Sequence, residues 1–348
     1  MKISNIIQAI NLCVSKRIPF VAYQMPNENN ITFFSNPTLT PNNKKFSIGF
    51  FGDKINNPIT IHNEFNAIET IEYINKYAVD QQHMPLIYPY NITTAFSAYK
   101  QSFINVTDYL KKGITKIVLS KVICGNHNIT DWSSVVLKYF NKFNSTFRYI
   151  YYTHNTGCWI GASPEVIIVK ENSNNNFSTM SLAGTRKISD KFQQWDNKNM
   201  SEHDIVTKYI VSTLREEGCV LDVSNYTSIP FGDIEHLCNH ITFKCPNEIS
   251  PINLVKVLSP TPALSGYPIN DSLKILEKIE AHPRYCYGGY VAVSDIDNFY
   301  SYVNLRCAHF DNKTFCIYSG GGITLESLVE EEWQETENKI VELKNIFI

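Results

Sequence analysis

Segments rich in Ile, Val, Phe and Tyr recur along the chain and constrain its fold more than any other feature. They have the composition of β-strands and occupy residues 45–51, 115–124, 147–153, 165–170, 177–183, 239–245, 287–293, 298–306 and 314–319. Apolar residues spaced by three and four, which is typical of helices, occur at residues 1–13, 95–111, 131–143, 202–217, 269–280 and 326–345. Because the strands form hairpin-like runs interrupted by separate helices, the sequence predicts an α+β fold with large antiparallel sheets covered by helices.

Composition excludes several classes of partner. The chain has 348 residues, with 31 basic and 33 acidic side chains and no dense basic run, so nucleic acid is not an expected partner. No uncharged stretch approaches the ~20 apolar residues of a membrane span. No linker rich in Pro, Gly or Ser divides the sequence, and we expect one domain over residues 1–348.

The cysteines argue against a metal cage or a disulfide framework. There are nine of them, an odd number, and none forms a CxxC pair. Reduced, buried thiols in a cytoplasmic protein are therefore the expectation.

Lys116 lies in the segment GITKIVLSKVIC, where apolar residues occupy both even-numbered and odd-numbered positions. A strand of this kind is covered on both faces. In a strand, Lys116 would lie on the same face as Ile114 and Val118, so we expect its amine to point into a narrow, dry space. Burial there disfavours the ammonium form and makes a lysine usable as a base. The alternative is a lysine at a strand end whose amine reaches the surface.

Glu165 follows Pro164 at the mouth of a second strongly apolar strand. A partly desolvated carboxylic acid keeps its proton longer and can serve as a general acid. The alternative is an exposed glutamate in a turn. A base and an acid on neighbouring strands would form a complementary pair.

Carboxylates border the buried faces of two predicted helices. Glu332, Glu335 and Lys339 lie along one border of the apolar stripe of the last helix, and Glu202 borders the buried face of a helix that we expect to begin at Ser201. Clusters of oxygen ligands without His or Cys suit Mg²⁺, so Glu202, Glu335 and Glu332 would hold one ion if the helices converge. The alternatives are an intrahelical pair between Glu335 and Lys339 and a first-turn acid at Glu202.

Two further features fit an anionic ligand. Glycines at 320–322 and at Gly184 could let backbone amides approach an anion closely. Arg306, which is buried by pattern, could anchor a carboxylate through two hydrogen bonds.

Taken in order, short motifs resemble those of the chorismate-binding enzyme family. They read KIVLSK, GASPE, SLAGTRK, SEHDIV, HL at 236–237, SPTPALSGYP, YGGYVAV, LRCAHF, SGGGIT and EEWQETENK. The resemblance covers residues 95–348, which we expect to form the catalytic core, and leaves residues 1–90 as a variable N-terminal portion. It implies antiparallel sheets packed together and flanked by helices, Mg²⁺ dependence, and chorismate as substrate.

Three positions distinguish activities within the family. Members that activate water carry lysine at the position of Lys116, whereas anthranilate synthases carry glutamine there. Aminodeoxychorismate synthases use a nucleophilic lysine at the position of Ala183, and salicylate synthases tend to place threonine at the position of Ala263. Together these residues favour isochorismate synthase, an isomerase, without an amidotransferase subunit.

The resemblance also implies a mechanism. Lys116 takes a proton from the water that attacks ring carbon 2, and Glu165 protonates the hydroxyl that leaves carbon 4. Glu202, Glu335 and Glu332 hold Mg²⁺. The residues implied to contact the substrate are Gly184, Arg306, Gly320, Lys339 and His236, the last of which could instead be a core histidine.

The sequence departs from the family's pattern at three positions. Lys121 replaces the usual arginine, Ser259 replaces the histidine usual before PTPA, and Asn199 stands where some relatives have a further acid. The alternatives left open are a salicylate synthase, an aminating synthase and a non-catalytic chorismate-binding protein. Menaquinone and siderophore pathways both fit the expected reaction.

Overall fold

Two antiparallel β-sheets form the centre of the protein in a computed structural model that describes residues 2–52, 58–77, 85–172, 175–190, 193–246 and 249–348. The first sheet has eight strands, in the order β13 (Gly266–Tyr267), β5 (Lys116–Asn126), β17 (Thr314–Ile323), β16 (Cys307–Phe310), β7 (Gly157–Ser163), β6 (Phe147–Thr153), β1 (Phe20–Gln24) and β2 (Thr32–Ser35). The second has nine, in the order β10 (Val220–Val223), β12 (Ile234–Lys244), β9 (Asn176–Lys187), β8 (Val166–Lys170), β15 (Phe299–Val303), β14 (Tyr290–Ser294), β3 (Lys45–Gly49) and β4 (Ile59–His62), with β11 (Thr227–Phe231) paired to β12. This arrangement confirms the predicted α+β fold.

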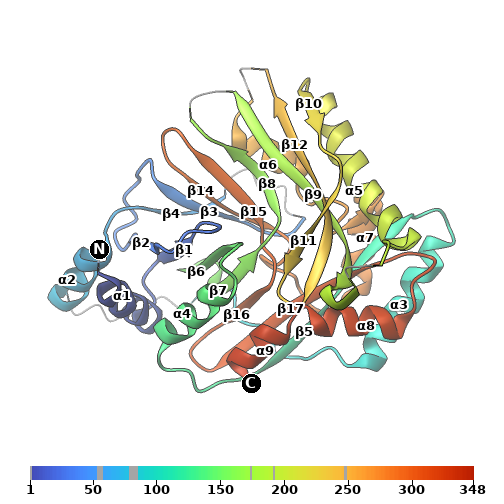
Figure 1. The fold of residues 1–348 in the computed structure, drawn as a ribbon. Helices are drawn as coiled ribbons and strands as arrows, with labels where there is room; N and C mark the ends of the chain where they lie inside the picture. The colour runs from blue at the N-terminus through green and yellow to red at the C-terminus, as the bar shows by residue number, and fades with distance from the viewer. Residues whose placement is uncertain (1, 53–57, 78–84, 173–174, 191–192, 247–248) are drawn as a thin grey trace.

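Aromatic side chains fill the space between the sheets. Tyr149 and Tyr151 of β6 and Trp159 of β7 are fully buried there against Val291 of β14. The rings of Phe147 and Tyr302, one from each sheet, stack with centroids 4.4 Å apart. Such offset stacking adds to the area that aromatic residues bury, so a continuous core joins the two sheets. Figure 1 labels strands of both sheets.

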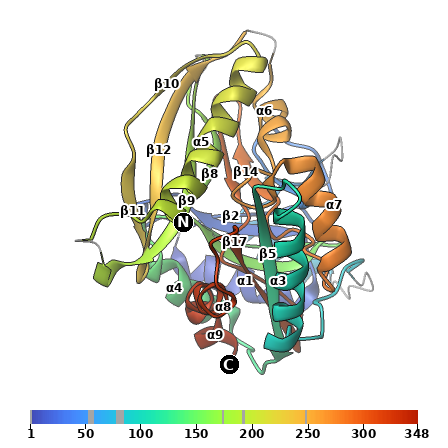
Figure 2. The same cartoon turned by 90° about the vertical axis from the view of Figure 1, so that its right-hand side faces the viewer.

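Helices cover the outer faces of both sheets. Helices α1 (Ile3–Lys16), α2 (Ala67–Tyr77), α4 (Trp132–Lys142) and α9 (Val341–Phe347) share an apolar cluster with the first sheet. Helices α5 (Asn197–Glu216) and α6 (Pro251–Leu258) pack on the second. Helices α3 (Phe96–Leu110), α7 (Ile269–Ile279) and α8 (Val329–Asn338) gather around β5, as Figure 2 shows.

Two predicted helices differ from those observed. Helix α5 begins at Asn197, more than a turn before the expected start, because the carboxylate of Asp196 caps it by accepting a hydrogen bond of 2.8 Å from the amide of Asn199. The expected helix over 326–345 is divided into α8 and α9. Its break coincides with Lys339, whose carbonyl accepts a hydrogen bond of 3.0 Å from Arg306.

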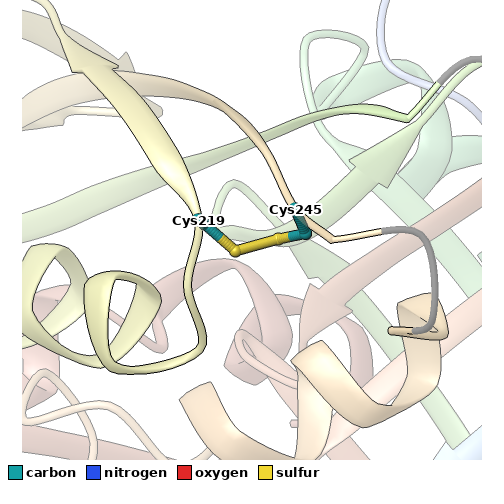
Figure 3. Close-up of a disulfide and its surroundings, with 2 residues drawn as sticks. All are labelled: Cys219 and Cys245. Atoms are coloured by element: carbon teal, nitrogen blue, oxygen red, sulfur yellow. A yellow bond between two sulfur atoms is a disulfide. The ribbon is translucent and has the colours of Figure 1, made fainter.

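The expectation of reduced thiols throughout was wrong for one pair. Cys219 and Cys245 form a disulfide that joins the start of β10 to the end of β12 (Figure 3). Pairing of these strands brings the two residues together although 26 positions separate them in sequence. In the described part of the chain the other seven cysteines are free. None of the described helices has both the length and the apolar character needed to cross a membrane.

Candidate active site

The site lies where the chain passes from one sheet to the other. Glu165 stands between β7 of the first sheet and β8 of the second, and Arg306 stands between β15 of the second and β16 of the first. Hydrogen bonds fix both connections, since the amide of Val303 donates to the carbonyl of Glu165 (2.9 Å) and the amide of Ala162 donates to that of Arg306 (3.3 Å). The two side chains are thereby held at the seam between the sheets.

A cleft opens at this seam. The predicted site residues that line it are Glu165, Gly184, Glu202, His236, Arg306, Gly320 and Lys339. The remaining three predicted residues stand directly behind its wall, at Lys116, Glu332 and Glu335. The structure therefore gathers in one place residues that the sequence distributes over more than two hundred positions.

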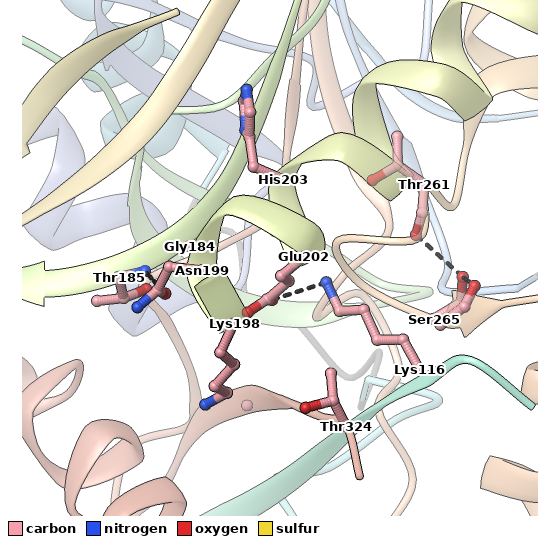
Figure 4. A network of polar contacts seen from close by, with 12 residues as sticks. Lys116, Gly184, Thr185, Lys198, Asn199, Glu202, His203, Thr261, Ser265 and Thr324 are labelled. Carbon is pink, nitrogen blue, oxygen red and sulfur yellow. Dashed lines mark hydrogen bonds and ion pairs between the residues drawn. The ribbon is translucent and has the colours of Figure 1, made fainter. Parts of the chain in front are cut away.

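Lys116 is the first residue of β5 and is fully buried. Its ammonium lies 2.7 Å from Oε1 of Glu202 on α5 (Figure 4). The alternative of a lysine that reaches the surface is therefore wrong. Gly322 of β17 makes room for this pair, because a Cβ there would lie 2.4 Å from the carboxylate oxygen of Glu202 and 2.7 Å from Cε of Lys116.

Glu165 is 3% exposed, so the alternative of an exposed turn is also wrong. Burial raises its pKa to about 8, and the positive charge of Lys116 opposes that rise. Glu165 therefore keeps its proton at neutral pH.

The three predicted metal-binding carboxylates are each paired with a lysine. The pairs are Glu202 with Lys116, Glu332 with Lys198, and Glu335 with Lys339. Burial and the neighbouring Glu335 raise the pKa of Glu332. Burial also raises the pKa of Glu335, but the ion pair of 2.5 Å with Lys339 outweighs this effect, so the pKa of Glu335 is lowered. The intrahelical pair that was the alternative reading of Glu335 is present.

The carboxylates converge on two glycines of β17. Oε2 of Glu332 would lie 3.1 Å from a Cβ at Gly321, and Oε1 of Glu335 would lie 3.8 Å from it. Glu202 approaches the adjacent Gly322. As the side chains stand, no three His, Cys, Asp or Glu residues in the described ranges form a cluster able to hold a metal ion.

The donor set nevertheless fits a hard cation. Oε2 of Glu332 is buried and has no hydrogen-bond partner among the described residues. The other donors nearby are carboxylate oxygens as well, which is the chemistry that Mg²⁺ prefers. Because Gly321 and Gly322 have no side chains, the carboxylate oxygens can approach one another beside β17.

His236 joins Gly184 to Arg306. Its Nδ1 lies 3.0 Å from the carbonyl of Gly184, and Nη2 of Arg306 lies 3.2 Å from its Nε2. Nδ1 must therefore carry the proton, because the guanidinium can only donate. Burial, followed by the charges of Arg306 and Lys339, lowers the pKa of His236 to about 3, so the ring is neutral.

Backbone conformation supports this arrangement. Gly184 has a φ of 76° and is the extra residue at an irregularity in the pairing of β9 with β12. A Cβ at Gly184 would lie 3.1 Å from the carbonyl of Asn199 on α5, which explains the glycine. Arg306 has a φ of 45°, a left-handed conformation that is unfavourable for a residue with a side chain and is typical of functional positions.

Sequence reasoning missed Lys198. It lies four residues before Glu202 and so shares its helix face, a signal that was hidden because the helix was expected to begin later. The cleft is also lined by Tyr287 and Tyr318, which the sequence did not single out. Ala183 and Ala263, at positions that distinguish activities, line it too.

Comparison with known proteins identifies the family. Residues 43–347 match the family described as chorismate binding enzyme. The chain belongs to this family. Among curated relatives, it is 29% identical over 211 residues to isochorismate synthase MenF of Haemophilus influenzae, covering 58% of this chain and 48% of that relative. It is 28% identical over 246 residues to isochorismate synthase EntC of Escherichia coli strain K12, covering 67% of this chain and 62% of that relative.

These matches therefore span about half to three fifths of the relatives' own lengths. A solved structure, the menaquinone-specific isochorismate synthase MenF from Escherichia coli, superposes with a TM-score of 0.78 at 18% identity. The superposition covers 97% of this chain and 91% of MenF, and it shows that the chain has the fold of this chorismate-binding enzyme.

Proposed function

We propose that the protein is an isochorismate synthase. In this reaction water adds to ring carbon 2 of chorismate, the ring double bonds shift, and the hydroxyl group leaves carbon 4 as water. No atoms are gained or lost overall. The observation that carries the proposal is that Glu165, which is buried, and Glu202 line one cleft, and that the fully buried Lys116 pairs with Glu202 directly behind its wall.

Lys116 is the proposed base. It removes a proton from the attacking water, which requires the amine to act without its own proton. Its present partner, Glu202, therefore has to give up the ion pair of 2.7 Å during the reaction. The side chain is completely buried, so no bulk water competes for the amine.

Glu165 is the proposed acid. With a pKa of about 8 it carries a proton at neutral pH and can donate it to the departing hydroxyl. After one turnover the proton from the attacking water is on Lys116, and Glu165 is ionised. Exchange of protons with solvent then restores both residues.

Cations around the cleft suit a substrate that carries two carboxylates. Arg306 and Lys339 both line it, and Lys339 is held in place by donating to the carbonyl of Gly320 at 3.0 Å. His236 accepts from Arg306 and so fixes the direction of the guanidinium. Gly184 and Gly320 complete the proposed binding surface.

Glu202, Glu335 and Glu332 are the proposed ligands of Mg²⁺. When bound, the ion supplies positive charge that neutralises the substrate's ring carboxylate and polarises the ring. Oε2 of Glu332, which is buried and has no hydrogen-bond partner in the described part of the chain, supports this assignment. Binding of Mg²⁺ by Glu202 would compete with the pairing of Glu202 to Lys116.

Residues lining the cleft support water addition over the related reactions. Ala183 offers no amine that could attack the ring, and Ala263 is the small residue that resembles the isochorismate synthase pattern. Lys116 stands where anthranilate synthases have glutamine. Menaquinone and siderophore biosynthesis are both compatible with this product, as is a cytoplasmic location.

Product analysis tests the proposal. Chorismate and Mg²⁺ are incubated with the purified protein, and products are separated by chromatography, with pyruvate measured by a coupled assay. We expect isochorismate without salicylate or pyruvate. Release of salicylate with pyruvate would indicate a salicylate synthase, and anthranilate formed with added ammonia would indicate an aminating enzyme.

A matched pair of variants tests the base. Lys116→Ala should lose at least about a hundredfold in kcat. Lys208→Ala changes a lysine on α5 whose side chain is 79% exposed and should leave kcat unchanged. Conversion by Lys116→Ala at the parent's rate would show that Lys116 is not the base.

A further inference from the structure

Lys198 occupies a position that the proposed function does not use. It lies in the first turn of α5, one turn before Glu202, and its ammonium forms an ion pair with Glu332 of α8. Figure 4 shows Lys198 and Glu202 extending from α5 toward the segments that carry Lys116 and Thr324. Lys198 therefore links the two helices whose carboxylates are the proposed metal ligands.

Lys198 compensates the most deeply buried of the three carboxylates, since the side chain of Glu332 is 1% exposed and those of Glu202 and Glu335 are 14% and 24% exposed. An uncompensated carboxylate at the depth of Glu332 would strongly destabilise the fold. The ammonium of Lys198 thus supplies the positive charge that Glu332 needs in the metal-free protein.

We propose that Lys198 is a built-in substitute for the divalent cation, which neutralises Glu332 in the metal-free protein and must leave when the metal binds. This inference rests on the proposed metal site. It adds that metal binding is an exchange of one cation for another, so that Lys198 weakens the apparent affinity for Mg²⁺ while stabilising the metal-free state.

Lys198 is the lysine best able to leave. Lys116 is fully buried, and Lys339 has a second bond to the carbonyl of Gly320. The side chain of Lys198 is 23% exposed, the highest fraction among the three paired lysines, so its ammonium can reach solvent by rotation of its stem. The other two lysines are held by Glu202 and by the carbonyl of Gly320, respectively.

Charge balance favours the exchange. The three carboxylates and three lysines compensate one another in the structure. If Lys198 stayed, Mg²⁺ would enter a neutral set and meet repulsion from a nearby ammonium. If Lys198 leaves, the two positive charges of the ion replace one, and Oε2 of Glu332 gains a partner.

Direct measurement of metal binding tests the inference. Mg²⁺ is titrated into the full-length protein by calorimetry without substrate, and thermal unfolding is followed with and without saturating Mg²⁺. Lys198→Met keeps the apolar stem and removes the charge. We expect about tenfold tighter Mg²⁺ binding, a lower unfolding temperature without metal, and a larger rise in that temperature on adding Mg²⁺.

Two further variants serve as controls. Lys198→Arg keeps a positive charge at the site and should bind Mg²⁺ no more tightly than the parent. Lys208→Met removes an exposed lysine from the same helix and should change neither measurement. If Lys198→Met unfolds without metal, it is prepared with Mg²⁺, and the chelator concentration that causes unfolding provides the comparison.

The outcomes separate this inference from the proposed function. Unchanged or weaker Mg²⁺ binding by Lys198→Met, with normal binding by the parent, would overturn the exchange alone. A parent that binds no Mg²⁺ would overturn both the exchange and the metal site. Conversion of chorismate is measured separately, so its failure would count against the proposed reaction whatever the metal titration shows.

Discussion

The ammonium of Lys116 and Oε1 of Glu202 lie 2.7 Å apart, although one belongs to a strand of the first sheet and the other to a helix on the second. They meet above Gly322 of β17, which pairs with Val118 of β5. The absence of a side chain at Gly322 is a geometric condition for the contact.

Gly322→Ala should therefore disrupt the site without changing its chemistry. The new Cβ would lie 2.4 Å from Glu202 and 2.7 Å from Lys116, so both side chains must move. Displacement of this size costs about a hundredfold in rate, measured as kcat with chorismate. Thermal unfolding provides the control for general loss of structure, and parent-like activity would contradict the observed packing.

Activity should decline as the pH rises through about 8. Glu165 must be protonated to act as the proposed acid, and its pKa of about 8 sets the limit. The measurement is kcat/KM from pH 6 to 10. Glu165→Gln should be inactive at every pH, and a profile that stays flat to pH 10 would contradict the assignment.

Stability should depend on pH through the same residue. The folded protein keeps the proton of Glu165 between its ordinary pKa of 4.5 and about 8, where the unfolded chain has lost it. Since the folded state binds more protons there, stability falls as the pH rises across this window. In Glu165→Gln this part of the decline should be missing. The unfolding free energy of the variant minus that of the parent should therefore be larger at pH 8.5 than at pH 5.

His236→Phe should affect substrate binding through Arg306. It removes the acceptor that directs the guanidinium and the donor to the carbonyl of Gly184. We expect KM for chorismate to rise by about tenfold or more, with a smaller change in kcat. His240→Phe, on an exposed position of β12, is the matched control. An unchanged KM would show that His236 does not position Arg306.

Removing the disulfide should reduce stability but leave activity intact. Cys219→Ala with Cys245→Ala opens a link across 26 residues, which should cost about 3 kcal/mol of unfolding free energy. Cys245 follows the end of β12 opposite to His236, so kcat should not change. Denaturant unfolding of the oxidised and thiol-reduced parent gives the same comparison, and equal stability of the two forms would contradict the bond.

The fold could be predicted largely because its strands are strongly apolar. Residues 147–153 were expected as a strand and form β6 with the same bounds. The burial of Lys116 could be predicted because apolar residues occupy both even and odd positions of its segment. The burial of Glu165 could be predicted because it precedes a strongly apolar strand. The family followed from the order of motifs, which local patterns by themselves do not supply.

The missed features depend on contacts between distant segments. The break after α8 reflects the bond from Arg306 to the carbonyl of Lys339, which no local spacing reveals. The disulfide depends on the pairing of β10 with β12, and β10 was not expected as a strand. Lys198 was missed because Ser201 resembles a cap, whereas Asp196 is the cap.

The position of β17 has a consequence for synthesis of the protein. This strand lies between β5 and β16 and carries the glycines on which the carboxylates converge. While the ribosome is still adding residues before Ile323, β5 has no partner on that side, and its unpaired edge is exposed to chaperones or to other nascent chains. The cleft is thus completed only after β17 has been synthesised and paired with β5, and chains truncated before that point would be prone to aggregation.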